Sequence, residues 1–342
     1  MQSKVKILLI YTGGTIGMMK NFETGALKAF NFGKLLQKIP ELKQLDCDIE
    51  TISFENPIDS SNFNPNNWIQ IAQIIEENYE KFDGFVVLHG SDTMSYSASA
   101  LSFILENLSK PVIFTGSQLP IGDLRTDAKE NLITAIQIAS LQQKSKPVIQ
   151  EVCLYFEYKL YRGNRTTKIN AEHFNAFASP NYPELVESGV HLKVNNEALL
   201  AYQPQKNFKT NKELNTNVAI VKMFPGINET VLSAILDIPN LKGIVLETYG
   251  SGNAPTDEWF ISLLERAIKK GLHIVNVTQC SGGSVSMGDY ETSTQLKDIG
   301  IISGKDITTE AAITKLMYLM GQQVAPNVFK TIFETPIRGE LS

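Results

Sequence analysis

The alternation of short, uninterrupted apolar runs with helical patterns is what most limits the folds open to this chain. Runs such as residues 7–10 and 85–88 have no polar face, which is typical of parallel strands covered on both sides. Between such runs, segments such as residues 66–79 repeat apolar side chains at helical spacing. Repeated strand–loop–helix units favour parallel sheets with right-handed crossovers, so we expect an α/β fold.

The same patterns place the expected elements and predict two domains. Strands are expected over residues 5–10, 49–54, 85–88, 112–115, 152–156, 218–223, 244–248 and 273–277, and helices over residues 66–79, 93–108, 128–141, 259–269 and 310–320. Because a single core stops growing near roughly 250–300 residues, a chain of 342 residues favours two doubly wound domains. We place a larger, Rossmann-like domain at residues 1–194 and a smaller one at residues 218–342, joined by a polar linker at residues 195–217.

Composition argues against several classes of protein. The net charge of −5, without a basic stripe interleaved with aromatic residues, argues against a nucleic-acid partner. No apolar run approaches the roughly 20 residues that cross a bilayer, and the first apolar stretch is too short for a signal peptide. Three distant cysteines, Cys47, Cys153 and Cys280, and four scattered histidines predict reduced thiols, a cytoplasmic location and no metal site.

Two loops carry the strongest chemical signal. TGGTIG (residues 12–17) and HGSDTM (residues 89–94) each follow an apolar strand, and ligands of open α/β sheets bind at the carboxyl ends of strands. The loops present glycines, hydroxyls and one acid, including Thr15, Ser91 and Asp92. Glycines allow a ligand to approach the backbone, and a hydroxyl beside an acid can become a nucleophile. This predicts acyl transfer rather than phosphate or metal binding.

Each motif also has a purely structural interpretation. TGGTIG does not fit the GxGxxG pattern of dinucleotide loops and could be a plain glycine turn. Residues 91–93 could be no more than a helix cap, with Asp92 at the capping position. LYRGNRTTK (residues 160–168) could be a solvated basic ribbon, and His89 a hydrogen-bonded histidine of the core.

Taken together, the motifs resemble those of the asparaginase/glutaminase family, and most closely those of its type I, cytoplasmic bacterial L-asparaginases. The segments that carry the resemblance are YTGGTIGM (11–18), DSSN (59–62), LHGSDTM (88–94), TGSQLP (115–120), LYRGNRTTK (160–168), FASPN (177–181), YGSGNAP (249–255), TQC (278–280) and RGEL (338–341). They follow the family order from end to end, so the resemblance covers essentially the whole chain.

The resemblance implies hydrolysis of L-asparagine to L-aspartate and ammonia through a threonine-linked acyl-enzyme, with no cofactor. It implies that Thr15 is the nucleophile and that Ser91, Asp92 and Lys168 form a second hydroxyl–acid–lysine group. The substrate-binding residues that it implies are Gly14, Asp59, Ser60, Ser61, Gly90, Ser117, whose backbone carbonyl would face the leaving amide, and Asn253, which would reach a neighbouring subunit's site. It also implies a smaller, flavodoxin-like C-terminal domain and assembly as a homodimer or a dimer of dimers.

The chain departs from the family pattern at three places. Ser91 stands where most members have threonine. Near the position of a lid tyrosine the chain has Ala26, flanked by Phe22 and Phe30. Glu247 stands where some cytoplasmic members have an arginine that helps to bind a second, regulatory asparagine.

Two other functions compete with the leading one. The subunit of the archaeal-type amidotransferase that feeds ammonia to misacylated tRNA shares the fold, but it carries an extra domain before its TGGTI loop, which here begins at residue 12. A non-catalytic module that binds an amino acid or a flavin is the second alternative. The joint presence of Thr15, Ser91, Asp92 and Lys168 argues against it.

Overall fold

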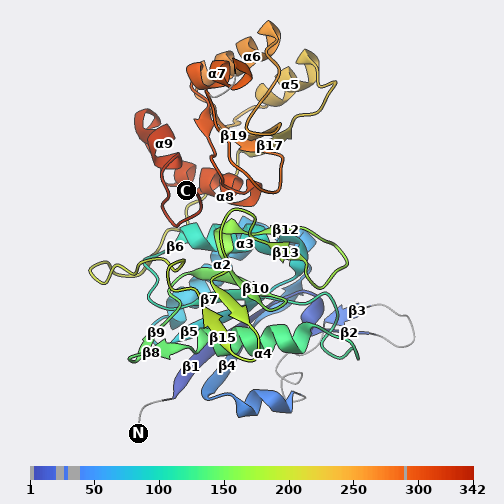
Figure 1. Cartoon of the computed structure of the whole chain (residues 1–342), viewed down its shortest axis with the longest axis vertical. Helices are drawn as coiled ribbons and strands as arrows, with labels where there is room; N and C mark the ends of the chain where they lie inside the picture. The colour runs from blue at the N-terminus through green and yellow to red at the C-terminus, as the bar shows by residue number, and fades with distance from the viewer. Residues whose placement is uncertain (1–3, 21–26, 30–38, 289–290) are drawn as a thin grey trace. The chain divides into compact units, whose positions relative to one another are not determined.

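The computed structural model describes residues 4–20, 27–29, 39–288 and 291–342, in two compact units, Met1–Lys212 and Glu213–Ser342 (Figure 1). Part of the polar segment 195–217, in which we expected a linker, packs on the first unit. There Lys209–Thr210 forms strand β16, and the ring of Phe208 stacks on Tyr79 with centroids 3.7 Å apart. The domain limits expected from the sequence stay a prediction.

The first unit contains an eight-stranded sheet, in the spatial order β15-β14-β11-β10-β7-β5-β1-β4. Its parallel part consists of β1 (Val5–Gly13), β4 (Cys47–Ile58), β5 (Gly84–Leu88), β7 (Val112–Thr115) and β10 (Val152–Phe156). The antiparallel extension consists of β11 (Lys159–Arg162), β14 (Val186–Ser188) and β15 (Leu192–Val194). Counted among the parallel strands alone, the order is 2-1-3-4-5, which confirms a doubly wound α/β fold and puts the switch point between β1 and β5.

Helices cover both faces of this sheet (Figure 1). Helices α2 (Pro65–Asn78) and α3 (Met94–Ile104) lie on one face, and α4 (Ala128–Ala139) lies on the other. Alternate residues of β1 divide accordingly, so that Ile7 and Leu9 join the core cluster that contains Leu132 of α4. The buried strands therefore owe their apolar character to helices on both sides, as the sequence predicted.

The expected helix over residues 93–108 is wrong at its end. Helix α3 stops at Ile104, because the next two residues form strand β6 (Leu105–Glu106), which pairs with β16. The ammonium of Lys209 lies 2.9 Å from the carboxylate of Glu106 across this pair. The remaining two-stranded pairs are β2 (Met18–Lys20) with β3 (Leu27–Ala29), β8 (Gln142–Gln143) with β9 (Lys146–Pro147), and β12 (Thr167–Lys168) with β13 (Phe177–Ala178).

The second unit is built on a smaller parallel sheet whose strands follow the chain order. The strands are β17 (Val218–Lys222), β18 (Gly243–Thr248), β19 (His273–Thr278) and β20 (Ile302–Ser303). The helices are α5 (Glu229–Leu236), α6 (Glu258–Lys269), α7 (Glu291–Asp298), α8 (Thr309–Gly321) and α9 (Pro326–Phe333). Leu232, Phe260 and Leu296, from α5, α6 and α7, share one core cluster with Ile244 and Ile274 of the sheet.

A fully buried ion pair ties the end of the chain to the second unit. Lys315 of α8 and Glu340 are both 0% exposed and contact each other directly. The ammonium of Lys315 also donates to the carbonyls of Phe333 and Thr335, at 2.6 and 2.8 Å, and Glu340 accepts the main-chain N–H of Arg338. Each buried charge therefore has hydrogen-bond partners, as burial requires.

Among the described residues, no helix combines the length and apolar character needed to cross a bilayer.

Candidate active site

The two loops predicted to carry the chemistry meet at the switch point of the large sheet. Strands β1 and β5 are parallel neighbours, and Tyr11 pairs with Leu88 just before the loops begin. Gly14 has a φ of +84°, and a Cβ on it would lie 2.5 Å from the amide nitrogen of Gly90. Only glycine fits such a contact without a shift of the backbone. The loop that contains Thr15 is therefore seated directly against the loop that contains Ser91.

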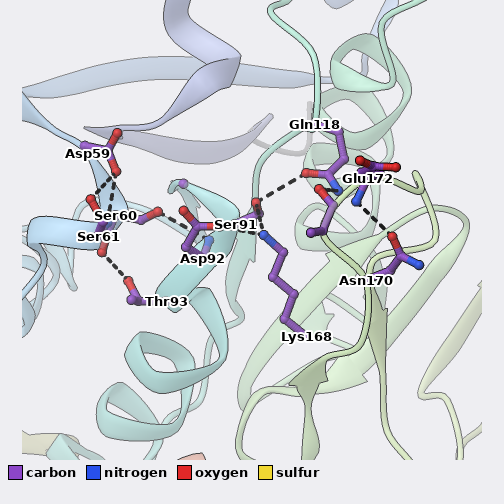
Figure 2. A network of polar contacts seen from close by, with 12 residues as sticks. Asp59, Ser60, Ser61, Ser91, Asp92, Thr93, Gln118, Lys168, Asn170 and Glu172 are labelled. Atoms are coloured by element: carbon purple, nitrogen blue, oxygen red, sulfur yellow. Dashed lines mark hydrogen bonds and ion pairs between the residues drawn. The ribbon is translucent and has the colours of Figure 1, made fainter.

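A third loop, which follows β4, completes the contact. A Cβ on Gly90 would lie 2.5 Å from the hydroxyl oxygen of Ser60, so Gly90 is packed between two of the loops. Ser60 accepts the main-chain N–H of Asp92 at 3.3 Å on its hydroxyl, and its carbonyl accepts the hydroxyl of Thr93 at 2.7 Å (Figure 2). Three segments from different parts of the sequence thus converge at one edge of the sheet.

The exposed carboxylate of Asp59 is held in its ionised form. It accepts both the main-chain N–H and the hydroxyl of Ser61, each at 2.9 Å (Figure 2). These two hydrogen bonds hold the pKa of Asp59 below its usual value, the main-chain bond having the larger effect. A fixed negative charge at this position is suited to a cationic group of a ligand.

Lys168 links the second hydroxyl to the acid. Its ammonium donates to the hydroxyl of Ser91 at 2.9 Å and to a carboxylate oxygen of Asp92 at 2.6 Å (Figure 2). The lysine side chain is 18% exposed, whereas that of Asp92 is 61% exposed. One lysine is therefore shared by a hydroxyl and a carboxylate, an arrangement through which a proton can move.

This geometry decides two of the structural interpretations. Residues 91–93 form a short 3₁₀ turn before α3, and within the described chain neither that turn nor α3 has a side-chain cap. The helix-cap interpretation of Asp92 is therefore wrong: its carboxylate makes no capping bond and instead pairs with the ammonium of Lys168. The solvated-ribbon interpretation of residues 160–168 is wrong as well, since Arg162 and Arg165 are buried, and Arg162 pairs with Glu151 at 2.7 Å.

The turn after β7 lies beside Ser91, because β7 and β5 are parallel neighbours. Ser117 is buried, and its hydroxyl donates to the carbonyl of Leu119 at 2.6 Å. The next residue, Gln118, carries no sequence signal of a site role. Its amide nitrogen donates to the carbonyl of His173 at 3.0 Å, and its amide oxygen lies 3.4 Å from the hydroxyl of Ser91 (Figure 2).

His89 is a hydrogen-bonded core histidine, as one interpretation of the sequence had it. Its Nδ1 lies 2.7 Å from the carbonyl of Gly90 and can only donate to it, so Nε2 must accept from the hydroxyl of Ser97 at 2.9 Å. The same hydroxyl accepts the indole N–H of Trp68 at 2.9 Å. Complete burial lowers the pKa of His89 to about 4, so the ring is neutral at neutral pH and stays fixed behind the Gly90 loop.

The remaining predicted residues lie elsewhere. Alone among the predicted site residues, all of which the structure describes, Asn253 belongs to the second unit, where it bridges to Tyr249 at the end of β18. Glu247, on the same strand, accepts the hydroxyl of Thr309 at 2.7 Å and lies 3.6 Å from the ammonium of Lys222. The positions near the missing lid tyrosine, Phe22, Ala26 and Phe30, lie outside the described residues.

Comparison with known proteins covers both units. A family model described as "Asparaginase, N-terminal" matches residues 6–200, and one described as "Glutaminase/Asparaginase C-terminal domain" matches residues 217–333. The chain is 41% identical to L-asparaginase 1 of Escherichia coli (strain K12) over 340 residues, which cover 99% of this chain and 98% of that protein.

Two solved structures of L-asparaginases match the fold of this chain over nearly its full length. The crystal structure of L-asparaginase I from Vibrio cholerae superimposes with a TM-score of 0.91 at 40% identity, over 99% of this chain and 100% of that one. The thermostable L-asparaginase from Thermococcus kodakarensis gives a TM-score of 0.87 at 32% identity, over 99% of both chains.

Proposed function

Because this chain belongs to the asparaginase family, we propose that its site hydrolyses L-asparagine to L-aspartate and ammonia, with Thr15 as the nucleophile. The match to an L-asparaginase over the full chain favours this reaction over both alternatives, an amidotransferase subunit and a non-catalytic binding module. The observation that carries the proposal is the meeting of the Thr15 loop with the group of Ser91, Asp92 and Lys168 at the switch point.

The reaction needs an activated hydroxyl, because an amide is a poor electrophile. The hydroxyl of Thr15 attacks the side-chain carbonyl of asparagine, the C–N bond breaks, and the nitrogen leaves as ammonia with an added proton. Water then attacks the acyl-enzyme and releases aspartate. Main-chain N–H groups of the 3₁₀ turn that begins at Ser91 can hold the oxyanion of each tetrahedral intermediate, and one such donor is typically worth about 3 kcal/mol.

Lys168 moves the proton in this proposal. In its neutral form it takes the proton of Ser91, whose oxygen in turn accepts the proton of the attacking hydroxyl. Asp92 stabilises the ammonium that forms, through the 2.6 Å contact.

The substrate is held at both ends. The carboxylate of Asp59 binds the α-ammonium group, and Ser60 and Ser61 bind the α-carboxylate. Gly14 and Gly90 let the three loops pack closely enough to surround the reacting amide. Ser117 presents its main-chain carbonyl to the leaving nitrogen.

Assembly is part of the same proposal. Asn253 completes the site of a neighbouring subunit, so the homodimer is the minimal active unit, either alone or within a dimer of dimers. Sedimentation during turnover tests this, since an active monomer at assay concentration would refute it. The cytoplasmic location expected from the sequence also belongs to the proposal, and cell fractionation tests it.

The activity itself is tested with purified protein. Incubation with L-asparagine should release ammonia and aspartate in equal amounts, and added hydroxylamine should divert the acyl-enzyme to aspartyl β-hydroxamate. A colourless protein with this activity would exclude the flavin-binding alternative. If no ammonia forms, asparagine hydrolysis is refuted; if ammonia forms without hydroxamate in the presence of hydroxylamine, the acyl-enzyme is refuted.

A further inference from the structure

The turn that contains Ser117 is held by hydrogen bonds to one buried carboxylate, that of Asp127. The main-chain N–H of Gln118 donates to both oxygens of this carboxylate, at 2.9 and 3.2 Å. The N–H of Leu119 donates to one of them at 3.1 Å. Asp127 is 7% exposed, and its burial raises its pKa. Two consecutive peptide groups are therefore fixed by a single acid.

Asp127 could have been no more than a helix cap, since it directly precedes α4. Its carboxylate, however, makes no capping bond to α4 in the part of the chain that the structure describes. It turns instead toward residues 118 and 119. The main-chain N–H groups that it accepts among the described residues thus belong to the loop after β7 and not to the first turn of the helix.

A second side chain holds the carboxylate in place. The amide nitrogen of Asn131 donates to Asp127 at 3.2 Å and to the carbonyl of Gly116 at 3.0 Å. The amide oxygen of Asn131 accepts the main-chain N–H of Glu157 at 3.0 Å. The peptide groups on both sides of Ser117 are therefore anchored, one by Asn131 and one by Asp127.

The direction of the Ser117 carbonyl follows from this anchoring. In a trans peptide the C=O of one residue and the N–H of the next point in opposite directions. The N–H of Gln118 points at Asp127, so the carbonyl of Ser117 points away from it. The side chain of Gln118, meanwhile, reaches the hydroxyl of Ser91 at 3.4 Å, which places this turn at the edge of the site.

We propose that Asp127 is a positioning residue, whose carboxylate fixes the Ser117–Gln118 peptide plane so that the Ser117 carbonyl accepts an N–H of the leaving amide. This inference rests on the proposed hydrolysis of asparagine. As the C–N bond breaks, the nitrogen becomes tetrahedral and gains a proton, and the fixed carbonyl orients its N–H groups. An ester has no N–H to donate before the bond breaks, and its leaving oxygen gains its single proton only as it departs as methanol, so the ester depends less on the same carbonyl.

The test compares an amide with an ester in the same enzyme. kcat/KM, which reports on all steps through acylation, is measured for L-asparagine and for the β-methyl ester of L-aspartate. In Asp127→Asn, one acceptor oxygen becomes an amide group that faces a main-chain N–H. We expect kcat/KM for asparagine to fall roughly 30-fold or more, as small misplacements of a positioning group do, and that for the ester to fall less than about threefold.

A matched control removes a similar acid elsewhere. Asp83 accepts the main-chain N–H of Lys6 at 2.8 Å, at the amino-terminal edge of the same sheet. Asp83→Asn should leave the ratio of the two kcat/KM values unchanged. Asp127→Glu, which keeps the charge but moves it by one methylene, should give an intermediate ratio and replaces Asp127→Asn if that variant does not fold.

The outcomes separate this inference from the proposed function. If kcat/KM falls equally for amide and ester, or falls for neither, the positioning role of Asp127 is overturned. Either result means that cleavage of the leaving amide does not depend specifically on Asp127. A wild-type enzyme that hydrolyses neither substrate would instead refute the proposed function.

Discussion

The ammonium of Lys168 lies 2.9 Å from the hydroxyl oxygen of Ser91, although 77 residues separate the two in the sequence. The chain makes this possible after β11, which runs antiparallel to β10 and so leads away from the edge where β5 ends. Residues 163–168 then return along α3 to that edge, where the hydroxyl of Thr166 lies 3.2 Å from that of Ser95. The hydroxyl of Ser91 therefore has a proton-transfer partner of its own, independent of Thr15.

Ser91→Thr should be tolerated, whereas Ser91→Ala should not. Threonine keeps the hydroxyl and adds a methyl group that restricts χ1, so kcat/KM should change by no more than about tenfold, or ~1.4 kcal/mol. Alanine leaves Lys168 without its hydroxyl partner and should be far worse. If alanine and threonine behave alike in steady-state kinetics, the hydroxyl has no part in the mechanism.

Thr15→Ala should abolish most of the turnover and leave the fold intact. Loss of an activated nucleophile typically lowers kcat by roughly 10³-fold or more. Thr15 lies in a short 3₁₀ turn and is not part of the buried core, so the thermal midpoint should stay close to that of the wild type. Near-normal kcat in this variant would show that another hydroxyl attacks first.

His89 should make the fold sensitive to mild acid. Its pKa is lowered by burial from 6.5 to about 4, so between these pH values the unfolded chain binds a proton that the folded chain does not. Stability from this group is fully present above pH 6.5 and is lost as the pH falls toward 4, by about 3 kcal/mol in total.

Urea unfolding across this pH range, in the wild type and in His89→Gln, measures the effect. The glutamine variant has no titrating group at the position, so its free energy of unfolding should fall less between pH 6.5 and 4. Asp127 and Glu130, whose pKa values are raised by burial, are common to both proteins and cancel in the difference. Identical pH profiles would mean that His89 titrates normally.

Kinetics in asparagine should be hyperbolic, with no regulatory asparagine bound. The resemblance to the family implies that Glu247 stands where some members have an effector-binding arginine. Its carboxylate accepts the hydroxyl of Thr309 at 2.7 Å. Reversing a charge at contact range changes an interaction by about 2 kcal/mol even in water, which matches a typical coupling energy of ~1–3 kcal/mol. A Hill coefficient well above one would show that another residue supplies the cation.

The fold could be predicted because its strands are buried on both faces. The parallel strands β1, β5, β7 and β10 each contain an uninterrupted apolar run, whereas β4, at the edge of the sheet, alternates apolar and polar residues. The helix periods between these strands are clear. Shorter elements left weaker signals: α5 and α9 are eight residues each, and β14 and β15 are three residues each. The end of α3 could not be read locally, since it depends on pairing with β16, about 100 residues later.

Some residues of the candidate site could likewise be predicted from the sequence, and others could not. The loops of Thr15 and Ser91 follow buried strands, so their position at the carboxyl ends of those strands follows from the sequence pattern. That they meet at the switch point depends on the strand order, which the pattern does not give. The role of Lys168 could be inferred only through the resemblance, because its partners lie in a turn that is 76 and 77 residues away in the sequence. Gln118 and Asp127 have no local signal, since a turn residue and an acid before a helix are common in any α/β protein.

The buried pair of Lys315 and Glu340 has a consequence for how the sequence can vary. Loss of one partner leaves a charge stranded in the core, at a cost of about 3–5 kcal/mol, whereas replacing both by apolar residues of similar size is often neutral. A change at one position is thus tolerated only with a change at the other. Relatives of this chain should inherit the two charges together or lack both, and a lineage that passed through a single replacement would have been under pressure to restore the pair.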